Sequence, residues 1–198
     1  PGSQFRYSVA TDVLAHVIEK ATGERLDDLL REHLFEPLQM QDTGFCIALD
    51  QQDRLMPMFG VSNLRDLSPM NPPMEQTLTA IDVDGMYPAA DSNFRRGGHG
   101  LFSTTSDYLK FATMLLDGKT VSGEVLLSRT MLKMMQANRI PEHQLPLKIG
   151  LGPLPGYGWG LTGRVMLDTG QAMSLTNNGE FGWSGAAATY FWVDPAES

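Results

Sequence analysis

The spacing of apolar residues predicts two helices near the start of the chain. The first covers residues 10–22, and Gly23 stands where a left-handed residue would end it. Its apolar positions, three and four residues apart, are Val13, Leu14, Val17, Ile18 and Ala21. A second amphipathic stretch follows over residues 26–35, and Pro37 ends it because proline cannot continue a helix.

Helical patterning returns only after a long interval. Residues 50–98 are rich in Pro, Met, Asn and Asp and carry no sustained period, so we expect a long loop that lines a site or is disordered. A capped helix is then predicted from the Ser/Thr cluster at 103–104 to Gly118, and another begins at Ser128. The apolar residues of this last helix, which we interpret as core residues, are Met131, Leu132, Met134 and Met135.

Short aromatic and β-branched stretches predict strands in the last quarter of the chain, over residues 157–161, 165–167 and 186–193. The dipeptide Asn178-Gly179 predicts a hairpin turn before the last of these strands. Helices followed by strands with hairpin-type connections indicate an α+β fold with an antiparallel sheet.

No internal repeat or clean linker divides the sequence. We therefore expect a single domain with a mainly helical part over residues 8–150, which contains a long loop over 50–96, and a sheet part over 156–198. Both ends of the chain are abrupt. The first residues lead straight into a helix, and a strand-like stretch stops within three residues of Pro195, so we expect these 198 residues to be part of a larger domain.

Charge and composition narrow the classes of function. The chain has 15 Lys and Arg against 23 Asp and Glu, a formal net charge of −8, which argues against nucleic acid or an anionic membrane as the main partner. No apolar run approaches the ~18 residues that span a bilayer, and the start of the chain has no signal-peptide pattern. These features favour a cytoplasmic protein that acts on a small molecule, and they leave its oligomeric state open.

Metal and cofactor chemistry finds no support in the sequence. The single cysteine, Cys46, excludes an internal disulfide and is interpreted as a small buried apolar residue. The histidines, none of which pairs with another at ligand spacing, are His16, His33, His99 and His143. The glycine-rich residues 97–100 lack the lysine and the spacing of phosphate-binding loops and are interpreted as a tight turn. We therefore expect no metal and no cofactor.

A serine nucleophile needs a base, and the sequence limits the choice. Residues 182–186 nearly match the G-x-S-x-G elbow of α/β-hydrolases, but no histidine follows Ser184 and the next residues are β-prone. Acyl transfer can instead use Lys or Tyr as the base. Tyr7 stands in a loop just before the first helix, where it could either project into a cleft or pack on the first helical turn.

Four blocks of sequence, in order, carry a resemblance to a known family. They are PGSQFRYS (1–8), LFEPLQMQDTGF (34–45), GHGLFSTTSDYLKF (98–111) and FGWSGA (181–186). Together they resemble the serine β-lactamase-related family, which includes class C β-lactamases, D,D-peptidases, family VIII carboxylesterases and LovD-type acyltransferases. The resemblance is weak only across residues 50–96 and 138–155. It implies a β-lactamase/transpeptidase-like fold in which three motifs meet between a helical subdomain and the edge of an antiparallel sheet.

Two of the three family motifs have counterparts here. The first, S-x-x-K, is absent, because no Ser in the chain has Lys three residues later. The second, Y-x-N, is matched by residues 7–9, which implies that Tyr7 is the base and proton shuttle. Val9 stands in place of the Asn, as in the esterase branch.

The third motif, K-T-G or H-x-G, is matched by Trp183, Ser184 and Gly185. Trp in place of the cation resembles family VIII esterases, whereas Ser184 differs from the esterase motif and is closer to the β-lactamase motif. The resemblance implies that Gly185 lets the acyl group approach the strand and that the backbone N–H of Ala186 is one oxyanion donor. Trp159 and Trp183 would form apolar surfaces of the pocket, and the loop over 50–96 would form its wall.

The function implied is that of a serine hydrolase that works through an acyl-enzyme. Its substrate is expected to be a small-molecule ester or β-lactam, with carboxylesterase activity on short-chain esters favoured. Three alternatives stay open: a β-lactamase, an acyltransferase, or a penicillin-recognition fold used only for binding. With two of three motifs present, the chain alone is expected to be inactive.

Overall fold

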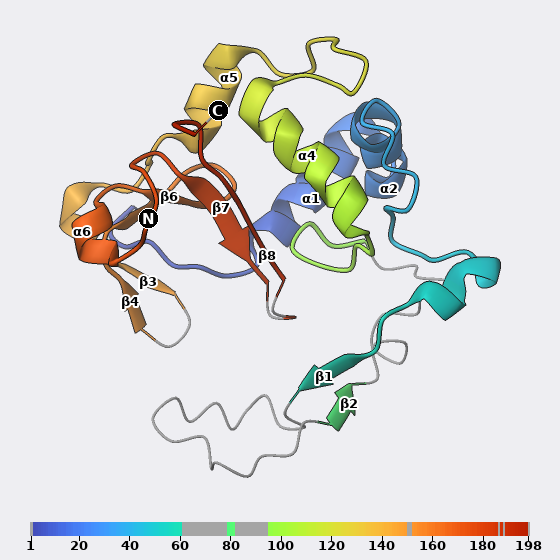
Figure 1. Cartoon of the computed structure of the whole chain (residues 1–198), viewed down its shortest axis with the longest axis horizontal. Coiled ribbons are helices and arrows are strands. Elements are labelled where there is room, and N and C mark those ends of the chain that lie inside the picture. Colours follow the sequence, from blue (N-terminus) through green and yellow to red (C-terminus); the bar gives the residue numbers. More distant parts are fainter. Residues whose placement is uncertain are drawn as a thin grey trace.

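The computed structural model describes residues 2–60, 79–81, 95–149, 152–185, 187 and 189–197. Helices dominate its first part and a sheet its last part (Figure 1). The main helices are α1 (Ala10–Thr22), α2 (Leu26–Leu30), α4 (Thr105–Asp117) and α5 (Arg129–Gln136). A π-helical segment over Arg31–Phe35 continues α2, so the predicted second helix is present with a widened last turn.

Four antiparallel strands form the main sheet in the order β5-β6-β7-β8. Their bounds are β5 Tyr157–Trp159, β6 Arg164–Met166, β7 Phe181–Ser184 and β8 Tyr190–Val193, with the short helix α6 (Thr169–Ala172) between β6 and β7. The predicted α+β fold with an antiparallel sheet is confirmed. The predicted strand over 186–193 is wrong at its start, because pairing with β7 begins at Tyr190. The turn at Gly179, with φ of 95°, therefore leads into β7.

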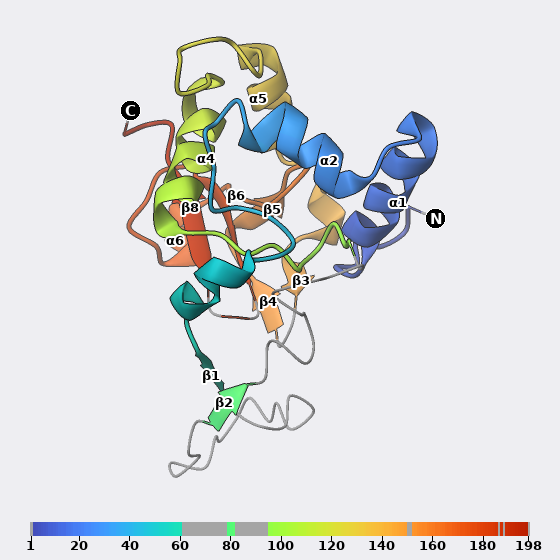
Figure 2. The same ribbon diagram turned by 90° about the vertical axis from the view of Figure 1, so that its right-hand side faces the viewer.

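Two smaller strand pairs lie outside the main sheet. β1 (Met58–Gly60) pairs with β2 (Thr79–Ile81), and this ribbon extends away from the helices and the main sheet in both Figure 1 and Figure 2. A 3₁₀ helix over Leu49–Arg54 leads into β1. The predicted loop over 50–96 thus contains short regular elements, and its residues 61–78 and 82–94 lie outside the described residues. β3 (Leu147–Ile149) pairs with β4 (Gly152–Leu154), just after a 3₁₀ turn over Glu142–Gln144.

One hydrophobic core joins the helices to the sheet. Its buried members are Phe35, Leu38, Met40, Met114, Leu115, Val165, Phe181 and Val193. Helix α4 packs along β8, and the rings of Tyr108 and Phe191 meet edge-to-face with their centroids 5.2 Å apart. Because this core is shared, the sheet is held in a fixed place relative to the helices. The division at residues 150–156 stays a prediction.

Helix α1 has its predicted bounds but exposes much of its apolar face. Gly23 ends it with φ of 77°. Ala15 is buried against Leu26 and Phe45, whereas Val13, Leu14 and Val17 are more than half exposed. The apolar spacing predicts which residues share a face of α1. No other described element covers most of that face.

Two expectations about buried residues are wrong. Helix α5 starts at the predicted Ser128 cap, whose Oγ accepts from the backbone N–H of Met131 at 3.2 Å. Its eight residues turn one side toward the core, so Leu132 is buried while Met131 and Met134 are half exposed. Cys46 is also exposed, because Phe45 occupies the buried position of that segment and the next side chain turns outward.

A buried carboxylate ties α4 to the segment after α2. Asp107, which is 4% exposed, accepts from the backbone N–H of Asp42 at 2.8 Å and from Thr43 Oγ1 at 3.0 Å. It also pairs with Lys110 Nζ at 2.9 Å. These contacts connect residues far apart in sequence, so Asp107 organises this side of the helical part.

The glycine-rich residues 97–100 pack closely on the first turns of α1. Gly98 N–H donates to Asp12 Oδ1 at 2.9 Å, and a Cβ at Gly97 would overlap the carbonyl oxygen of Thr11. Gly100 has φ of 100°, a left-handed conformation that favours glycine. The absence of a side chain at Gly97 therefore lets this loop approach the helix that follows Tyr7.

Gly97→Ala is expected to lower the free energy of unfolding by about 1–3 kcal/mol, the usual cost of overpacking a close contact. Urea unfolding of the chain measures it. Gly152→Ala is the matched control, because a Cβ there meets nothing within 4 Å and its φ is not positive. Equal midpoints for the two variants would contradict the close-packing role of Gly97.

Candidate active site

Tyr7 lies at one end of the main sheet. It belongs to the extended segment before α1 and is 49% exposed. Its ring centroid is 5.6 Å from that of Trp159 and 5.2 Å from that of Trp183. These ring contacts are with residues of the sheet, and the two alternatives for Tyr7, projection into a cleft and packing on the first helical turn, stay predictions.

The two tryptophans come from different strands and also contact each other. Trp159 ends β5 and Trp183 lies in β7, and their rings meet edge-to-face at 4.6 Å. The Phe5 ring lies 5.8 Å from that of Trp159. We call Phe5, Tyr7, Trp159 and Trp183 the aromatic cluster. Aromatic pairs in these geometries contribute about 0.5–1.5 kcal/mol each beyond area burial, so the cluster holds the N-terminal segment against the sheet.

Ser184 and Gly185 stand at the exposed end of β7. Ser184 pairs with Tyr190 of β8, and Gly185 N–H donates to Thr189 O at 2.8 Å. Ser184 is thus followed by a return strand, whereas a nucleophile elbow requires a helix there. Side chains alternate along a strand, so Ser184 and Trp183 belong to opposite faces. Ala186, the predicted oxyanion donor, lies outside the described residues.

Val9 does not join the aromatic cluster. It is the exposed N-cap residue of α1, and its carbonyl accepts from the N–H groups of Asp12 and Val13. Its side chain lines a separate hollow of about 390 Å³, shared with Asp12, His16, Glu19, Arg95 and Arg96. The structure therefore brings together Tyr7, Trp159 and Trp183, and Val9 is close to Tyr7 in sequence but lies outside this group.

Sequence reasoning missed Phe5. The signal was its position two residues before Tyr7, because alternate residues of an extended segment face the same way. Both rings accordingly meet Trp159.

Within the described part of the chain the Tyr7 hydroxyl makes no hydrogen bond, and the neighbouring Arg6 guanidinium donates to Gln4 Oε1. A phenol acts as a base more readily where a nearby positive charge stabilises its deprotonated oxygen. None of the ion pairs in the described residues involves the aromatic cluster.

The described part of the chain holds neither a metal-binding cluster nor a helix able to span a membrane. No group of three or more His, Cys, Asp or Glu side chains in the described part of the chain is arranged to hold a metal ion. Among the described helices, none has the length and apolar character needed to cross a bilayer.

Tyr7 precedes α1 and packs on Trp183 of the W-S-G motif, which agrees with the family resemblance. The expected edge position of that motif is wrong for the described sheet, because β7 lies between β6 and β8. A family model described as Beta-lactamase matches residues 1–198. The chain belongs to the Beta-lactamase family. The family and the β-lactamase/transpeptidase-like fold predicted from the sequence are confirmed.

Relatives with curated names include esterases. Esterase EstB of Burkholderia gladioli is 26% identical over 208 residues, which cover 99% of this chain and 48% of EstB. Protein Rv1367c of Mycobacterium tuberculosis is 31% identical over 200 residues, which cover 99% of this chain and 47% of that protein. The chain thus spans about half the length of these relatives.

Solved structures agree on the fold. EstCE1, described as a hydrolase with promiscuous acyltransferase activity, superposes with a TM-score of 0.76 at 27% identity, over 99% of this chain and 49% of EstCE1. LovD of Aspergillus terreus superposes with a TM-score of 0.74 at 21% identity, over 99% of this chain and 48% of LovD. At this identity the match shows the fold alone.

Proposed function

We propose that this chain forms the part of a serine hydrolase active site that carries the tyrosine and the W-S-G strand, and that the enzyme works through an acyl-enzyme. One observation carries the proposal: the Tyr7 ring lies 5.2 Å from that of Trp183, although the two residues stand near opposite ends of the chain. These positions match two of the family's three catalytic motifs, and the esterases among the relatives support the same class of reaction.

The nucleophile is proposed to come from outside these 198 residues. No Ser here has Lys three residues later, and the relatives are about twice as long. We use the term parent protein for the longer protein to which we propose the chain belongs. The exposed apolar face of α1 directly follows Tyr7 and would give the Ser- and Lys-bearing segment a surface to pack on.

In the proposed mechanism, the Lys and Tyr7 take the proton of the Ser hydroxyl as its oxygen attacks the ester carbonyl carbon. The tetrahedral intermediate collapses, the bond from carbonyl carbon to alcohol oxygen breaks, and Tyr7 returns a proton to the leaving alcohol. Tyr7 then takes a proton from water, whose oxygen attacks the carbonyl carbon of the acyl-enzyme. The bond from that carbon to Ser Oγ breaks, and Tyr7 returns the proton to Ser Oγ as the acid leaves. A Lys cation beside the phenol would stabilise the deprotonated oxygen, so the same group can take a proton in one step and return it in the next.

The end of β7 would bind the carbonyl oxygen. The backbone N–H of Ala186 is proposed as one oxyanion donor and the N–H of the nucleophilic Ser as the other. Gly185 has no side chain to obstruct the approach of the acyl group. Removing one oxyanion donor typically slows catalysis by ~10²–10³, so this strand end contributes directly to rate.

The proposed substrates are short-chain esters. The aromatic cluster offers an apolar wall beside Tyr7, and the family's Asn and strand cation are replaced by Val9 and Trp183. Without the Asn amide and the cation of the third motif, the site has fewer groups that could bind the amide and the carboxylate of a β-lactam. Acyl transfer to a bound alcohol is the second candidate, favoured by the promiscuous acyltransferase activity stated for EstCE1.

Assays of the parent protein on two chromogenic substrates test the proposed class. p-Nitrophenyl butyrate should be turned over, and the cephalosporin nitrocefin should be turned over at least about a hundredfold less efficiently, a difference of about 2.7 kcal/mol in transition-state binding. The reverse order would replace esterase by β-lactamase, and turnover of neither would favour a binding module.

Trp159→Ala in the parent protein is expected to raise KM for p-nitrophenyl butyrate about tenfold, because losing about 1.4 kcal/mol of apolar contact corresponds to that factor. kcat should change by a smaller factor than KM, because the Trp183 ring still packs on Tyr7 when the indole of Trp159 is removed. Leu161→Ala is the control, because Leu161 is an exposed apolar residue two positions on and outside the aromatic cluster. A KM unchanged by Trp159→Ala would remove this side chain from the pocket.

A further inference from the structure

Trp159 is the central member of the aromatic cluster. Its ring takes part in three of the four ring contacts within the cluster, those with Phe5, Tyr7 and Trp183. It ends β5, which has only three residues and pairs with β6 at the end of the described strand order. Short strands with one partner open more readily than central ones, so the position of this indole depends on what else holds its backbone.

The segment that follows α5 holds the backbone of Trp159. Trp159 N–H donates to Asn138 Oδ1 at 3.1 Å, and Trp159 O accepts from the backbone N–H of Arg139 at 2.7 Å. Two residues further along the chain, Leu161 N–H donates to Met135 O at 2.9 Å. This segment therefore takes the place of a neighbouring strand, and Asn138 supplies one of its acceptors from a side chain.

The Asn138 amide is oriented by its own segment. Its Oδ1 also accepts from the backbone N–H of Ile140 at 3.0 Å, and its Nδ2 donates to Ile140 O at 2.9 Å. This paired contact sets the plane of the amide, so the oxygen is directed at the N–H of Trp159. The contact needs an acceptor and a donor at this length of side chain, and Asp lacks the donor.

The glycines on either side of Trp159 leave room for this contact. A Cβ at Gly158 would overlap Oδ1 and Cγ of Asn138, and a Cβ at Gly160 would overlap Met135 O. Both glycines are buried and neither has a positive φ. The close approach of the segment after α5, and not an unusual backbone conformation, therefore accounts for the missing side chains.

The same segment also contacts the residues that lead to Tyr7. Gln144 Nε2 donates to Gly2 O at 3.0 Å, and Gly2 lies in the stretch before α1 that carries Phe5 and Tyr7. The chain from Asn138 to Gln144 thus bonds to both parts of the molecule that meet in the aromatic cluster, the sheet and the N-terminal segment. A shift on either side would move the Tyr7 ring relative to the sheet.

We propose that Asn138 is a positioning residue, whose amide holds the Trp159 indole against Tyr7 and so sets the shape of the apolar wall beside the substrate. Asn138 acts through Trp159, because its described hydrogen bonds go to Trp159 and Ile140 and not to Tyr7. The other bond to Trp159 comes from a backbone N–H, so only the bond from Asn138 depends on a side chain. The inference rests on the proposed function, since the wall affects kinetics only if a substrate lies beside it.

A double-mutant cycle in the parent protein, with p-nitrophenyl butyrate as substrate, tests the inference. Asn138→Ala should raise KM about three- to tenfold, because without this bond the indole is in place for a smaller fraction of the time and apparent affinity falls with that fraction. Asn138→Ala combined with Trp159→Ala should have the KM of Trp159→Ala alone, because both changes act on one indole. Gln136→Ala is the matched control and should keep KM within about twofold, since the Gln136 amide bonds to Leu115 O of α4 and not to β5.

Three kinetic results would overturn the inference. They are an unchanged KM in Asn138→Ala, increases in KM that multiply in the double variant, and an equal increase in Gln136→Ala. If Asn138→Ala does not fold, Gly158→Ala tests the same contact from the strand, because its Cβ would displace the Asn138 amide. An unchanged KM in Gly158→Ala would then count against Asn138 in the same way.

Circular dichroism of the parent protein gives a readout that needs no catalysis. The rings of Trp159 and Trp183, 4.6 Å apart and edge-to-face, couple electronically, and the band from this coupling is the one lost in Trp159→Ala. Asn138→Ala should lose at least about half of the same band, because the indole is displaced for much of the time. Gln136→Ala should retain it.

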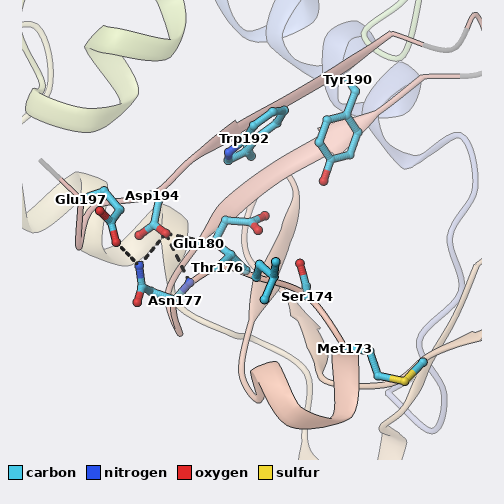
Figure 3. Close-up of a pocket in the computed structure, with 10 residues that line it drawn as sticks. Met173, Ser174, Thr176, Asn177, Glu180, Tyr190, Trp192, Asp194 and Glu197 are labelled. Atoms are coloured by element: carbon cyan, nitrogen blue, oxygen red, sulfur yellow. Dashed lines mark hydrogen bonds between the residues drawn. The ribbon is translucent and has the colours of Figure 1, made fainter.

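The third tryptophan of the chain serves as a constant background. Trp192 lies beside Tyr190 in a separate groove (Figure 3), outside the aromatic cluster, so its signal should be the same in all variants. A parent protein without esterase activity in which Asn138→Ala loses the coupling band would remove the proposed function alone. An intact band in Asn138→Ala would overturn the inference.

Discussion

Tyr7→Phe in the parent protein should lower kcat for p-nitrophenyl butyrate by about 10²–10⁴, the usual contribution of a positioned general acid–base. Phe retains the ring and its contacts with Trp159 and Trp183, so the hydroxyl is the group removed. KM should change less than about threefold because the apolar wall is intact. Steady-state kinetics over a range of pH measures both effects. The limb of the pH–rate profile that reports deprotonation of the base should disappear in the variant.

The matched control is Tyr157→Phe. Tyr157 packs its ring on the Arg164 guanidinium and lies outside the aromatic cluster, so its hydroxyl has no proposed part in the reaction. Its kcat should stay near that of the unmodified protein. If Tyr7→Phe also retains kcat and the pH profile, Tyr7 serves packing only and the proposed base is elsewhere.

Asp107→Ala should lower the free energy of unfolding of the 198-residue chain by about 2–4 kcal/mol, because hydrogen bonds to a charged group contribute about 1.5–3 kcal/mol each and a buried donor left without a partner adds to the cost. The N–H of Asp42 would lose its acceptor, and Lys110 would lose its ion pair. Lys110 is about a third exposed, so we place the effect below that of a fully buried pair.

Urea denaturation followed by circular dichroism measures this loss, with Asp50→Ala as the control. Asp50 is exposed in a 3₁₀ turn and has no hydrogen bond or ion pair among the described contacts, so its replacement should change the free energy of unfolding by less than about 0.5 kcal/mol. If the two variants unfold at the same urea concentration, Asp107 does not organise the helical part.

Local signals predicted the helices well. The bounds of α1 follow from apolar spacing and Gly23, and those of α4 from Thr104 and Gly118, because capping depends on residues next to one another. Strand bounds depend on a partner strand, so the sequence missed β7 as a separate strand and began β8 too early. Periodicity likewise identified the apolar face of α1 but could not indicate whether another element covers it.

The site was predicted through the family resemblance and not through spacing. No local pattern indicates that Tyr7 meets Trp183, because that contact depends on the whole chain between them. Trp159 was predicted only as an apolar surface of the pocket. Its contact with Tyr7 was not predicted, and Phe5 was missed. The role of Ala186 as an oxyanion donor and that of Val9 in recognition stay predictions.

Labelling with a fluorophosphonate probe, followed by mass spectrometric mapping of the modified serine, tests the central claim most directly. The parent protein should be labelled at one Ser that has Lys three residues later and lies outside these 198 residues, and the chain alone should not be labelled. Labelling of a serine within the chain, such as Ser184, with loss of both label and ester hydrolysis in the Ser→Ala variant, would contradict the account.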